Sequence, residues 1–202
     1  MIRKAIISDV PAMGHIINDA AELGLMLPKS QSMLYENIRE FYVATDEDHQ
    51  APTNPAGVVG VCGLSVIWAN LGEVVSLAVA AHQRGRGLGR QLVERCLEDA
   101  RQLGIRRVMS LTYERAFFER LGFSVVDRQN LPLKVWADCV RCPKQEACDE
   151  IAMIREFSDI PDLGAQSGGA RGMVLTREAD AAGPLPYQVP VVLTATAGHH
   201  GG

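Results

Sequence analysis

The sequence predicts one α/β domain of the α+β kind, a β-sheet flanked by helices, and three observations favour it. Short runs rich in β-branched residues alternate along the chain with segments whose apolar residues recur at helical spacing. Residues 72–104 have the pattern of a strand, a glycine turn and a helix in direct succession. The chain has 202 residues, which is enough for one domain with a proper core and too few for two.

The first part of the chain predicts a strand, a helix and an apolar loop. The strand covers residues 2–7. Ser8 or Asp9 can cap the helix that follows, which ends near Gly24. Residues 25–30 form a loop that is unusually apolar, which indicates that it folds back over another part of the molecule.

Further elements follow in alternation up to residue 155. A polar turn at residues 46–57 is the expected tip of a hairpin, and glycines 60 and 63 predict a bend or bulge in the strand after it. We expect a helix from Ser30 or Ser32, strands at 41–45, 58–68, 74–79 and 107–112, helices at 88–103 and 114–121, a strand at 123–127, a helix at 133–141 and a strand at 150–155.

Glycine, alanine, serine and proline dominate from about residue 156. This composition predicts that residues 156–202 form a mostly disordered tail behind a domain of residues 1–155. Deleting the tail should then leave a folded domain.

Composition and charge narrow the classes of partner. The net charge of −4 gives no excess of positive charge for nucleic acid or an anionic membrane. The longest apolar stretch, residues 58–68, is too short for a membrane span, and the first residues do not have the pattern of a signal peptide. Five cysteines, an odd number, favour a reducing cytoplasm. We therefore expect a cytoplasmic protein that acts on small molecules and binds neither nucleic acid nor membrane.

The glycine turn at residues 84–90, Arg-Gly-Arg-Gly-Leu-Gly-Arg, suits an anion. The first turn of a helix has N–H groups without carbonyl partners, and glycines let the backbone approach a phosphate closely. A P-loop would continue Gly-Lys-Ser/Thr, but Arg90 follows Gly89; a dinucleotide fingerprint would need Gly-x-Gly-x-x-Gly, but these glycines alternate. The remaining alternative is a plain surface turn.

The pattern Arg-x-x-Gly-x-Gly, at Arg84, Gly87 and Gly89, resembles the coenzyme A diphosphate loop of the GNAT superfamily of acetyltransferases. The order of the expected elements resembles a whole GNAT domain, which has a mixed, mostly antiparallel sheet. The segments at 28–39, 73–79, 111–123 and from 134 on resemble short single-domain N-acetylglutamate synthases, a group named amino-acid N-acetyltransferase.

The resemblance implies acetyl-CoA as co-substrate and no metal. The backbone of Leu77, Ala78 and Val79 would hold the pantetheine arm and the thioester carbonyl, with a bulge that frees an N–H group for the oxyanion. The backbone amides expected to bind the diphosphate are those of Arg84, Gly85, Arg86, Gly87, Leu88, Gly89 and Arg90.

Two residues are candidates for the proton transfers. Glu73 stands where two-domain N-acetylglutamate synthases have a glutamate, so it is the candidate base, acting directly or through a water. An ordinary glutamate, with a pKa of about 4.3, is a weak base unless it is desolvated, and a solvated carboxylate is the alternative. GNAT enzymes usually place the tyrosine that protonates the thiolate where this chain has Phe118. Tyr113 is the nearest substitute, since a phenol stays protonated at neutral pH; a packed aromatic is its alternative.

The acceptor site is less defined. Lys29 in the apolar loop is a candidate partner for a substrate carboxylate, and Ser76 and Arg115 are further candidate contacts. Related sequences often carry a basic residue where this chain has Val75, which leaves the acceptor open.

Cys139, Cys142 and Cys148 have a spacing that suggests a metal site, but a structural zinc needs four ligands, so free thiols are the expectation.

The leading hypothesis is an enzyme of arginine biosynthesis that acetylates the α-amino group of an amino acid, glutamate first, by direct attack in a ternary complex. The alternatives are an acetyltransferase for another amine or a protein N-terminus, and a non-catalytic module that binds acyl-CoA. A homodimer is left open.

Overall fold

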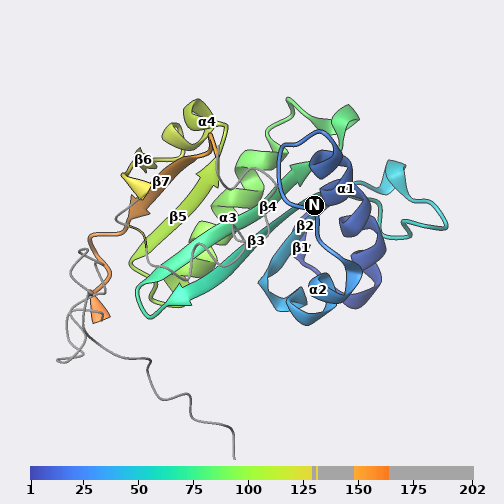
Figure 1. The fold of residues 1–202 in the computed structure, drawn as a ribbon. Helices are drawn as coiled ribbons and strands as arrows, with labels where there is room; N and C mark the ends of the chain where they lie inside the picture. The colour runs from blue at the N-terminus through green and yellow to red at the C-terminus, as the bar shows by residue number, and fades with distance from the viewer. Residues whose placement is uncertain (129–130, 132–147, 164–202) are drawn as a thin grey trace, which may run out of the picture.

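The computed structural model describes residues 1–128, 131 and 148–163. The strands it describes form one seven-stranded sheet with the order β1-β2-β3-β4-β5-β7-β6 (Figure 1). Neighbouring strands are antiparallel except β4 and β5, which are parallel. The strands are β1 (Ile2–Lys4), β2 (Phe41–Thr45), β3 (Val58–Trp68), β4 (Leu71–Val79), β5 (Arg107–Thr112), β6 (Ser124–Val125) and β7 (Ile151–Glu156).

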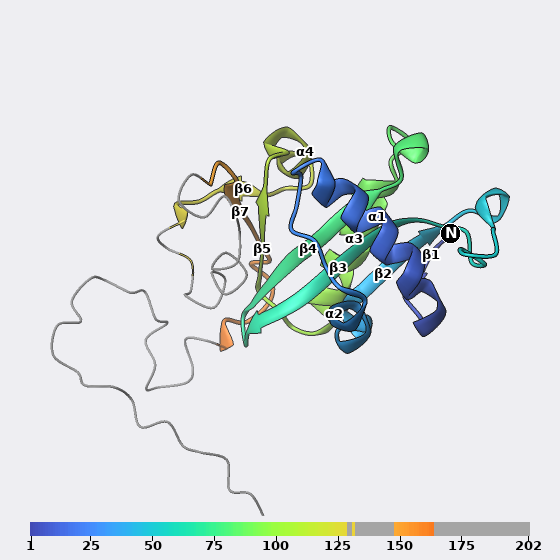
Figure 2. The same ribbon diagram turned by 45° about the vertical axis from the view of Figure 1, so that its right-hand side comes forward.

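Helices cover both faces of this sheet (Figures 1 and 2). One face carries α1 (Val10–Glu22) and α2 (Gln31–Glu36), and the other carries α3 (Leu88–Gln102) and α4 (Arg115–Glu119). Short 3-10 turns join them at Ile7–Asp9, Ile38–Glu40, Glu47–His49 and Ala81–Gln83.

Side chains of β3 show how the two faces divide the core. Val61 packs in the cluster beneath α1, whereas Cys62 packs in the cluster beneath α3, because neighbouring side chains of a strand point to opposite faces. Both are fully buried. The sheet is therefore held between two apolar layers, as the predicted fold class requires.

Three expected strands are confirmed with the bounds that the sequence predicts, and the strand expected at 74–79 begins earlier, at Leu71. The strands at 41–45, 58–68 and 107–112 match β2, β3 and β5. Ser30 caps α2, since its hydroxyl accepts a hydrogen bond from the Met33 N–H at 3.2 Å. Gly24 follows the end of α1 with a φ of 70°.

Two strands are shorter than expected. The first strand ends at Lys4 rather than residue 7 because the Asp9 carboxylate accepts the Ile6 N–H at 2.9 Å and starts a turn there. Asp9 holds the position before α1 but does not cap it with its side chain; its carboxylate instead pairs with Arg3 at 2.6 Å. The strand expected at 123–127 reduces to Ser124–Val125, an edge strand that pairs with β7 alone.

The described chain continues past residue 155, the expected end of the domain. Phe157 is 3% exposed, packs in the cluster beneath α3, and lies under the guanidinium of Arg101, 4.6 Å from its ring centroid. The boundary between domain and tail stays a prediction. Residues 164–202, and the helix expected at 133–141, lie outside the described residues.

In the described part of the chain, no helix combines the length and the apolar character that crossing a membrane would need.

Candidate functional site

The site begins where two neighbouring strands separate. The parallel strands β4 and β5 pair only at Leu71–Arg107, Gly72–Val108 and Glu73–Met109. Beyond Glu73 no pairing between them is present, so N–H and C=O groups of β4 that would face β5 are open to a ligand.

A bulge bends β4 just past this point. Between its pairs with Gly63 and Val61, β3 advances two residues while β4 advances three, from Val75 to Ala78. Ser76 has a φ of 52°, the one non-glycine residue with positive φ among those the structure describes. The extra residue of a bulge lies outside the ladder, so the bulge expected around Leu77 is present in the structure.

The glycine turn follows at the end of β4 and opens α3. Gly85 and Gly87 have φ values of 77° and 81°, and a Cβ at Gly85 would meet nothing within 4 Å. The Gln91 N–H donates to the Gly87 carbonyl at 3.1 Å. The amides of residues 88–90 precede it in the first turn, where a helix offers them no acceptor. Packing does not explain the glycine at position 85, because no protein atom lies close to where its Cβ would be. The glycines of the turn instead allow its positive φ values and let a ligand approach the backbone closely.

The arginines of the turn make contacts within the protein. Arg84 Nε donates to the Val79 carbonyl at 3.1 Å, Arg90 pairs with Glu94 at 2.7 Å, and Arg86 donates to Gln83 Oε1 at 2.6 Å. The backbone amides of residues 85–90, rather than these side chains, are thus the groups of the turn that are ready for an anion; the Arg84 N–H instead donates to the Ala81 carbonyl at 3.3 Å.

Gln83 is a residue that the sequence did not point to. Its side chain is 3% exposed, accepts from Arg86, and donates to Asp46 Oδ2 at 3.0 Å. It therefore fixes the glycine turn to the β2–β3 hairpin. The pKa of Asp46 is lowered first of all because its carboxylate accepts a hydrogen bond from the Asp48 N–H, and a hydrogen bond with His49 lowers it further.

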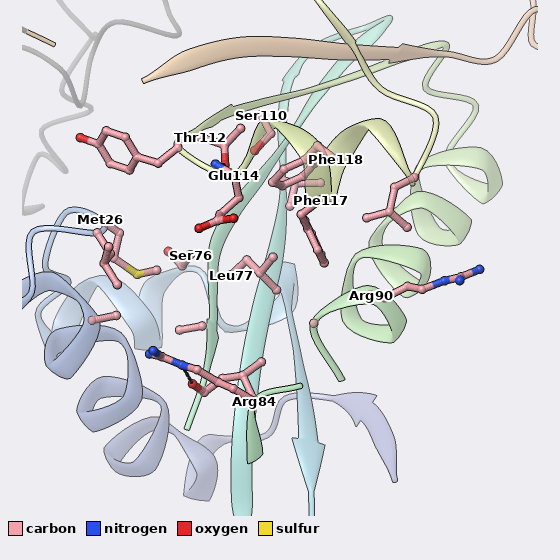
Figure 3. Close-up of a pocket in the computed structure, with 18 of the residues that line it drawn as sticks. Met26, Ser76, Leu77, Arg84, Arg90, Ser110, Thr112, Glu114, Phe117 and Phe118 are labelled. Atoms are coloured by element: carbon pink, nitrogen blue, oxygen red, sulfur yellow. Dashed lines mark hydrogen bonds between the residues drawn. The ribbon is translucent and has the colours of Figure 1, made fainter. Parts of the chain in front are cut away.

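The separated strands, the bulge and the glycine turn line one cavity of about 680 Å³ (Figure 3). A cavity of this size is typical of a small-molecule site. Leu25 and Met26 of the apolar loop line it, so the expectation that this loop folds over something is confirmed. Of the expected site residues, those that line it are Ser76, Leu77, Ala78, Val79, Arg84, Gly85, Gly87, Leu88, Gly89, Arg90 and Tyr113.

The end of β5 forms the opposite wall. Ser110 and Thr112 are 3% and 8% exposed, and both line the cavity with Tyr113 and Glu114. Phe118, in the position of the family's usual tyrosine, is 3% exposed and also reaches the cavity. Sequence reasoning missed Ser110, Thr112 and Glu114; their position next to Tyr113 was the available signal.

Four expected site residues do not line the cavity. Glu73 lies on β4 where that strand still pairs with β5, and it is half-buried. The backbone of Lys29 is held to Asn18 by hydrogen bonds of 3.0 and 3.1 Å. Arg115 turns to Glu119 at 2.7 Å, and Arg86 to Gln83. Their roles stay predictions.

The described cysteines show no metal site. Cys62 and Cys96 are buried with their Sγ atoms 3.5 Å apart, and burial raises the pKa of the Cys62 thiol. Cys148 contacts Arg128 Nη2 at 3.3 Å, while Cys139 and Cys142 lie outside the described residues. Among the residues the structure describes, no three His, Cys, Asp or Glu side chains are grouped to hold a metal ion.

Comparison with known proteins adds three likenesses. The sequence profile of the acetyltransferase (GNAT) family matches residues 15–123. An uncharacterized N-acetyltransferase of Chlorobaculum tepidum is 36% identical over 154 residues, 76% of this chain and 94% of that protein. An amino-acid acetyltransferase of Mycobacterium tuberculosis is 36% identical over 141 residues, 70% of this chain and 78% of that protein.

A solved structure shares the fold. The N-acetylglutamate synthase of Neisseria gonorrhoeae, complexed with coenzyme A and N-acetyl-glutamate, superposes with a TM-score of 0.65 and 25% identity. The match covers 77% of this chain but only 34% of that one, so most of that protein lies outside the match.

Proposed function

Because this chain belongs to the GNAT acetyltransferase family, with acetyl-CoA as its co-substrate, we propose that it moves the acetyl group to the α-amino group of an amino acid. The amino-acid acetyltransferase of Mycobacterium tuberculosis supports this class of acceptor. Glutamate is the first acceptor to test, because the structural neighbour from Neisseria gonorrhoeae was solved with N-acetyl-glutamate.

One observation carries the proposal: the cavity between β4 and β5 joins the glycine turn to the wall that holds Tyr113. In this proposal the amides of residues 85–90 bind the diphosphate, because the Arg84 N–H is engaged with the Ala81 carbonyl. The backbone of Leu77, Ala78 and Val79 holds the pantetheine arm. An open N–H group at the bulge then faces the developing oxyanion. The donor would thus lie along the cavity with its thioester near Leu77.

The proton transfers are assigned to two residues. Tyr113 gives a proton to the departing thiolate, which its place on the cavity wall supports. Glu73 takes the proton of the amine through a water, because its side chain does not line the cavity. No covalent enzyme intermediate is needed: the amine attacks within a ternary complex, and positioning supplies most of the rate gain.

The acceptor contacts follow the same reasoning. Ser76 lines the cavity at the bulge and is the better supported contact. Lys29 and Arg115 stay candidates only if they move toward the substrate, because Arg115 pairs with Glu119 and Lys29 does not line the cavity.

A thiol-release assay with acetyl-CoA and a panel of amino acids, small amines and N-terminal peptides tests the proposal. We expect release of coenzyme A with one or a few amino acids, and an N-acetylated product of matching mass. Turnover restricted to polyamines or peptides would replace the proposed acceptor class and leave the acetyl transfer in place.

A non-catalytic acyl-CoA-binding module is the second candidate. Phe118 favours it, because this buried ring has no proton to give a thiolate. In that case calorimetry would detect acetyl-CoA binding while every amine in the panel stays unacetylated.

A further inference from the structure

Glu114 is a cavity residue that has no role in the assignments above. Its backbone is fixed by three hydrogen bonds: its N–H donates to Thr112 Oγ1 at 2.9 Å, and its carbonyl accepts from the N–H groups of Phe117 and Phe118 at 3.1 and 3.2 Å. Thr112 and Phe118 are buried. The direction in which the Glu114 side chain leaves the backbone is therefore set by the core.

That direction leads into the cavity. Figure 3 shows the Glu114 carboxylate extending toward Ser76 and Leu77, on the side of the cavity opposite the bulge. Met26 and Phe117 line the same space with apolar surface. A carboxylate next to apolar side chains is partly desolvated, so a cation that binds beside it stabilises its negative charge.

The protein itself gives Glu114 no such cation within the described residues. No ion pair there includes Glu114, whereas its neighbour Arg115 pairs with Glu119 on the same helix at 2.7 Å. Of the arginines that line the cavity, Arg84 and Arg90 are likewise engaged with Val79 and Glu94. Arg120 is exposed and forms no ion pair with Glu114 among the described residues. The cation that this carboxylate suits is thus one carried by a ligand.

We propose that the Glu114 carboxylate binds the α-ammonium group of the acceptor and so acts as an acceptor-binding residue opposite Leu77. This inference rests on the proposed function, in which an amine must reach the thioester at that place. The ammonium binds at Glu114 and loses one proton, which passes through water to Glu73. The nitrogen then forms a bond to the acetyl carbon, the carbon–sulfur bond breaks, and the thiolate takes a proton from Tyr113. The second proton of the new amide nitrogen passes through water to the Tyr113 oxygen, which restores the phenol.

The test compares Glu114→Gln with the wild-type protein, using each amino acid that the wild type acetylates. A hydrogen bond to a charged group contributes less at an exposed residue such as Glu114 than at a buried one. We therefore expect the KM for the acceptor to rise about fivefold to tenfold. The KM for acetyl-CoA should stay unchanged, and kcat should fall by less than about twofold, since the variant loses binding rather than chemistry.

Glu98→Gln is the matched control, because it removes an exposed carboxylate of α3 that pairs with Arg95 outside the cavity. It should leave both KM values unchanged. The rise in Glu114→Gln should be the same for acceptors with acidic, neutral and basic side chains, because the contact is to a group they share.

Three results would overturn the inference: an unchanged acceptor KM, a parallel rise in the KM for acetyl-CoA, or a rise only for acceptors with a basic side chain. If the wild type acetylates amino acids and Glu114→Gln keeps its acceptor KM, the inference fails alone. If the wild type acetylates no amino acid, the proposed function fails and takes the inference with it.

Discussion

Gly87 adopts a backbone conformation that other residues reach only with strain, and it does so at the start of α3. Its φ is 81°, and the nearest group that a Cβ would meet is the end of the Gln91 side chain, at 3.9 Å. Space beside it is open on the cavity side. A positive φ together with open space next to the cavity indicates a glycine that is needed for ligand binding. A glycine that is needed for packing would instead have protein atoms close to the position of its missing Cβ.

Gly87→Leu should therefore weaken acetyl-CoA binding by at least about tenfold, because the added side chain occupies the approach to the amides. Gly104→Leu is the control: Gly104 follows the other end of α3, with a φ of 74° and nothing within 4 Å of a Cβ. Both variants carry a similar backbone strain of about 1–2 kcal/mol. Calorimetry with equal acetyl-CoA affinities for the two variants would refute the diphosphate assignment.

Tyr113→Phe removes one hydroxyl from the cavity wall and keeps the ring. If the phenol protonates the thiolate, kcat should fall by about a hundredfold, the lower end of the range for general acid catalysis, while the acetyl-CoA affinity stays within about twofold. Tyr42→Phe, which changes a tyrosine of β2 that does not line the cavity, should keep full activity. Steady-state kinetics that show full turnover in Tyr113→Phe would clear this residue of the acid role.

At the scale of elements, the bulge in β4 is the feature on which the cavity depends. Ser76 is held at a φ of 52°, which costs a residue with a Cβ about 1–2 kcal/mol relative to an ordinary strand. The neighbouring β5 leaves β4 at the same place, so the strained residue and the opening coincide. A strained backbone conformation such as that of Ser76 persists only where the surrounding structure holds the residue in place.

Two substitutions at Ser76 separate strain from side-chain contact. Ser76→Gly should unfold at nearly the wild-type temperature, because glycine adopts positive φ without strain but loses more entropy on folding. Ser76→Val should be about 1–2 kcal/mol less stable than Ser76→Gly, because a β-branched residue resists this conformation. Thermal unfolding measures both, and equal stability of the two variants would contradict a strained bulge.

The sequence predicted elements better than it predicted the cavity walls. The bounds of β2, β3 and β5 followed from β-branched runs between polar turns, and Ser30 capped α2 as expected. The length of the first strand was wrong because Asp9 bonds to Ile6 and Arg3, a contact that propensity does not encode. Such contacts depend on the folded chain and leave no periodic pattern.

In the candidate site, too, the features with a local sequence pattern were predicted and the features that depend on tertiary contacts were not. The glycine turn was recognisable because its spacing is local, and its glycines line the cavity. Glu114 and Gln83 were missed because their roles depend on contacts between segments that are far apart in the sequence. Glu114 lines the cavity between β4 and β5, and Gln83 bonds to Asp46 after β2. Arg115, one residue further on, was chosen instead of Glu114, and it turns to Glu119. Adjacent residues at the start of a helix point in different directions, so only one of the two side chains reaches the cavity.

At the scale of the whole molecule, the sheet order places two distant parts of the chain beside β5. The parallel strand β4 lies on one side of it, and β7, which follows the undescribed residues 132–147, lies on the other. β7 pairs with β5 along six residues, from Thr112–Ile151 to Arg107–Glu156. The wall that carries Tyr113 and Glu114 is thus supported by the last described strand, and the end of the folded chain matters for the site.

Truncation tests where that end lies. A chain that stops after Leu163 keeps Phe157, and it should match the full-length protein in melting temperature and acetyl-CoA turnover. A chain that stops after Arg155 loses this buried ring and the Arg106–Glu156 ion pair at 2.7 Å. Loss of a buried phenylalanine costs about 3–5 kcal/mol, so the melting temperature should fall by about 10 °C or more. Phe157→Ala in the full chain should reproduce most of that fall. If the chain ending at Arg155 melts like the full-length protein, the domain ends before Phe157 and this ring adds nothing to its core.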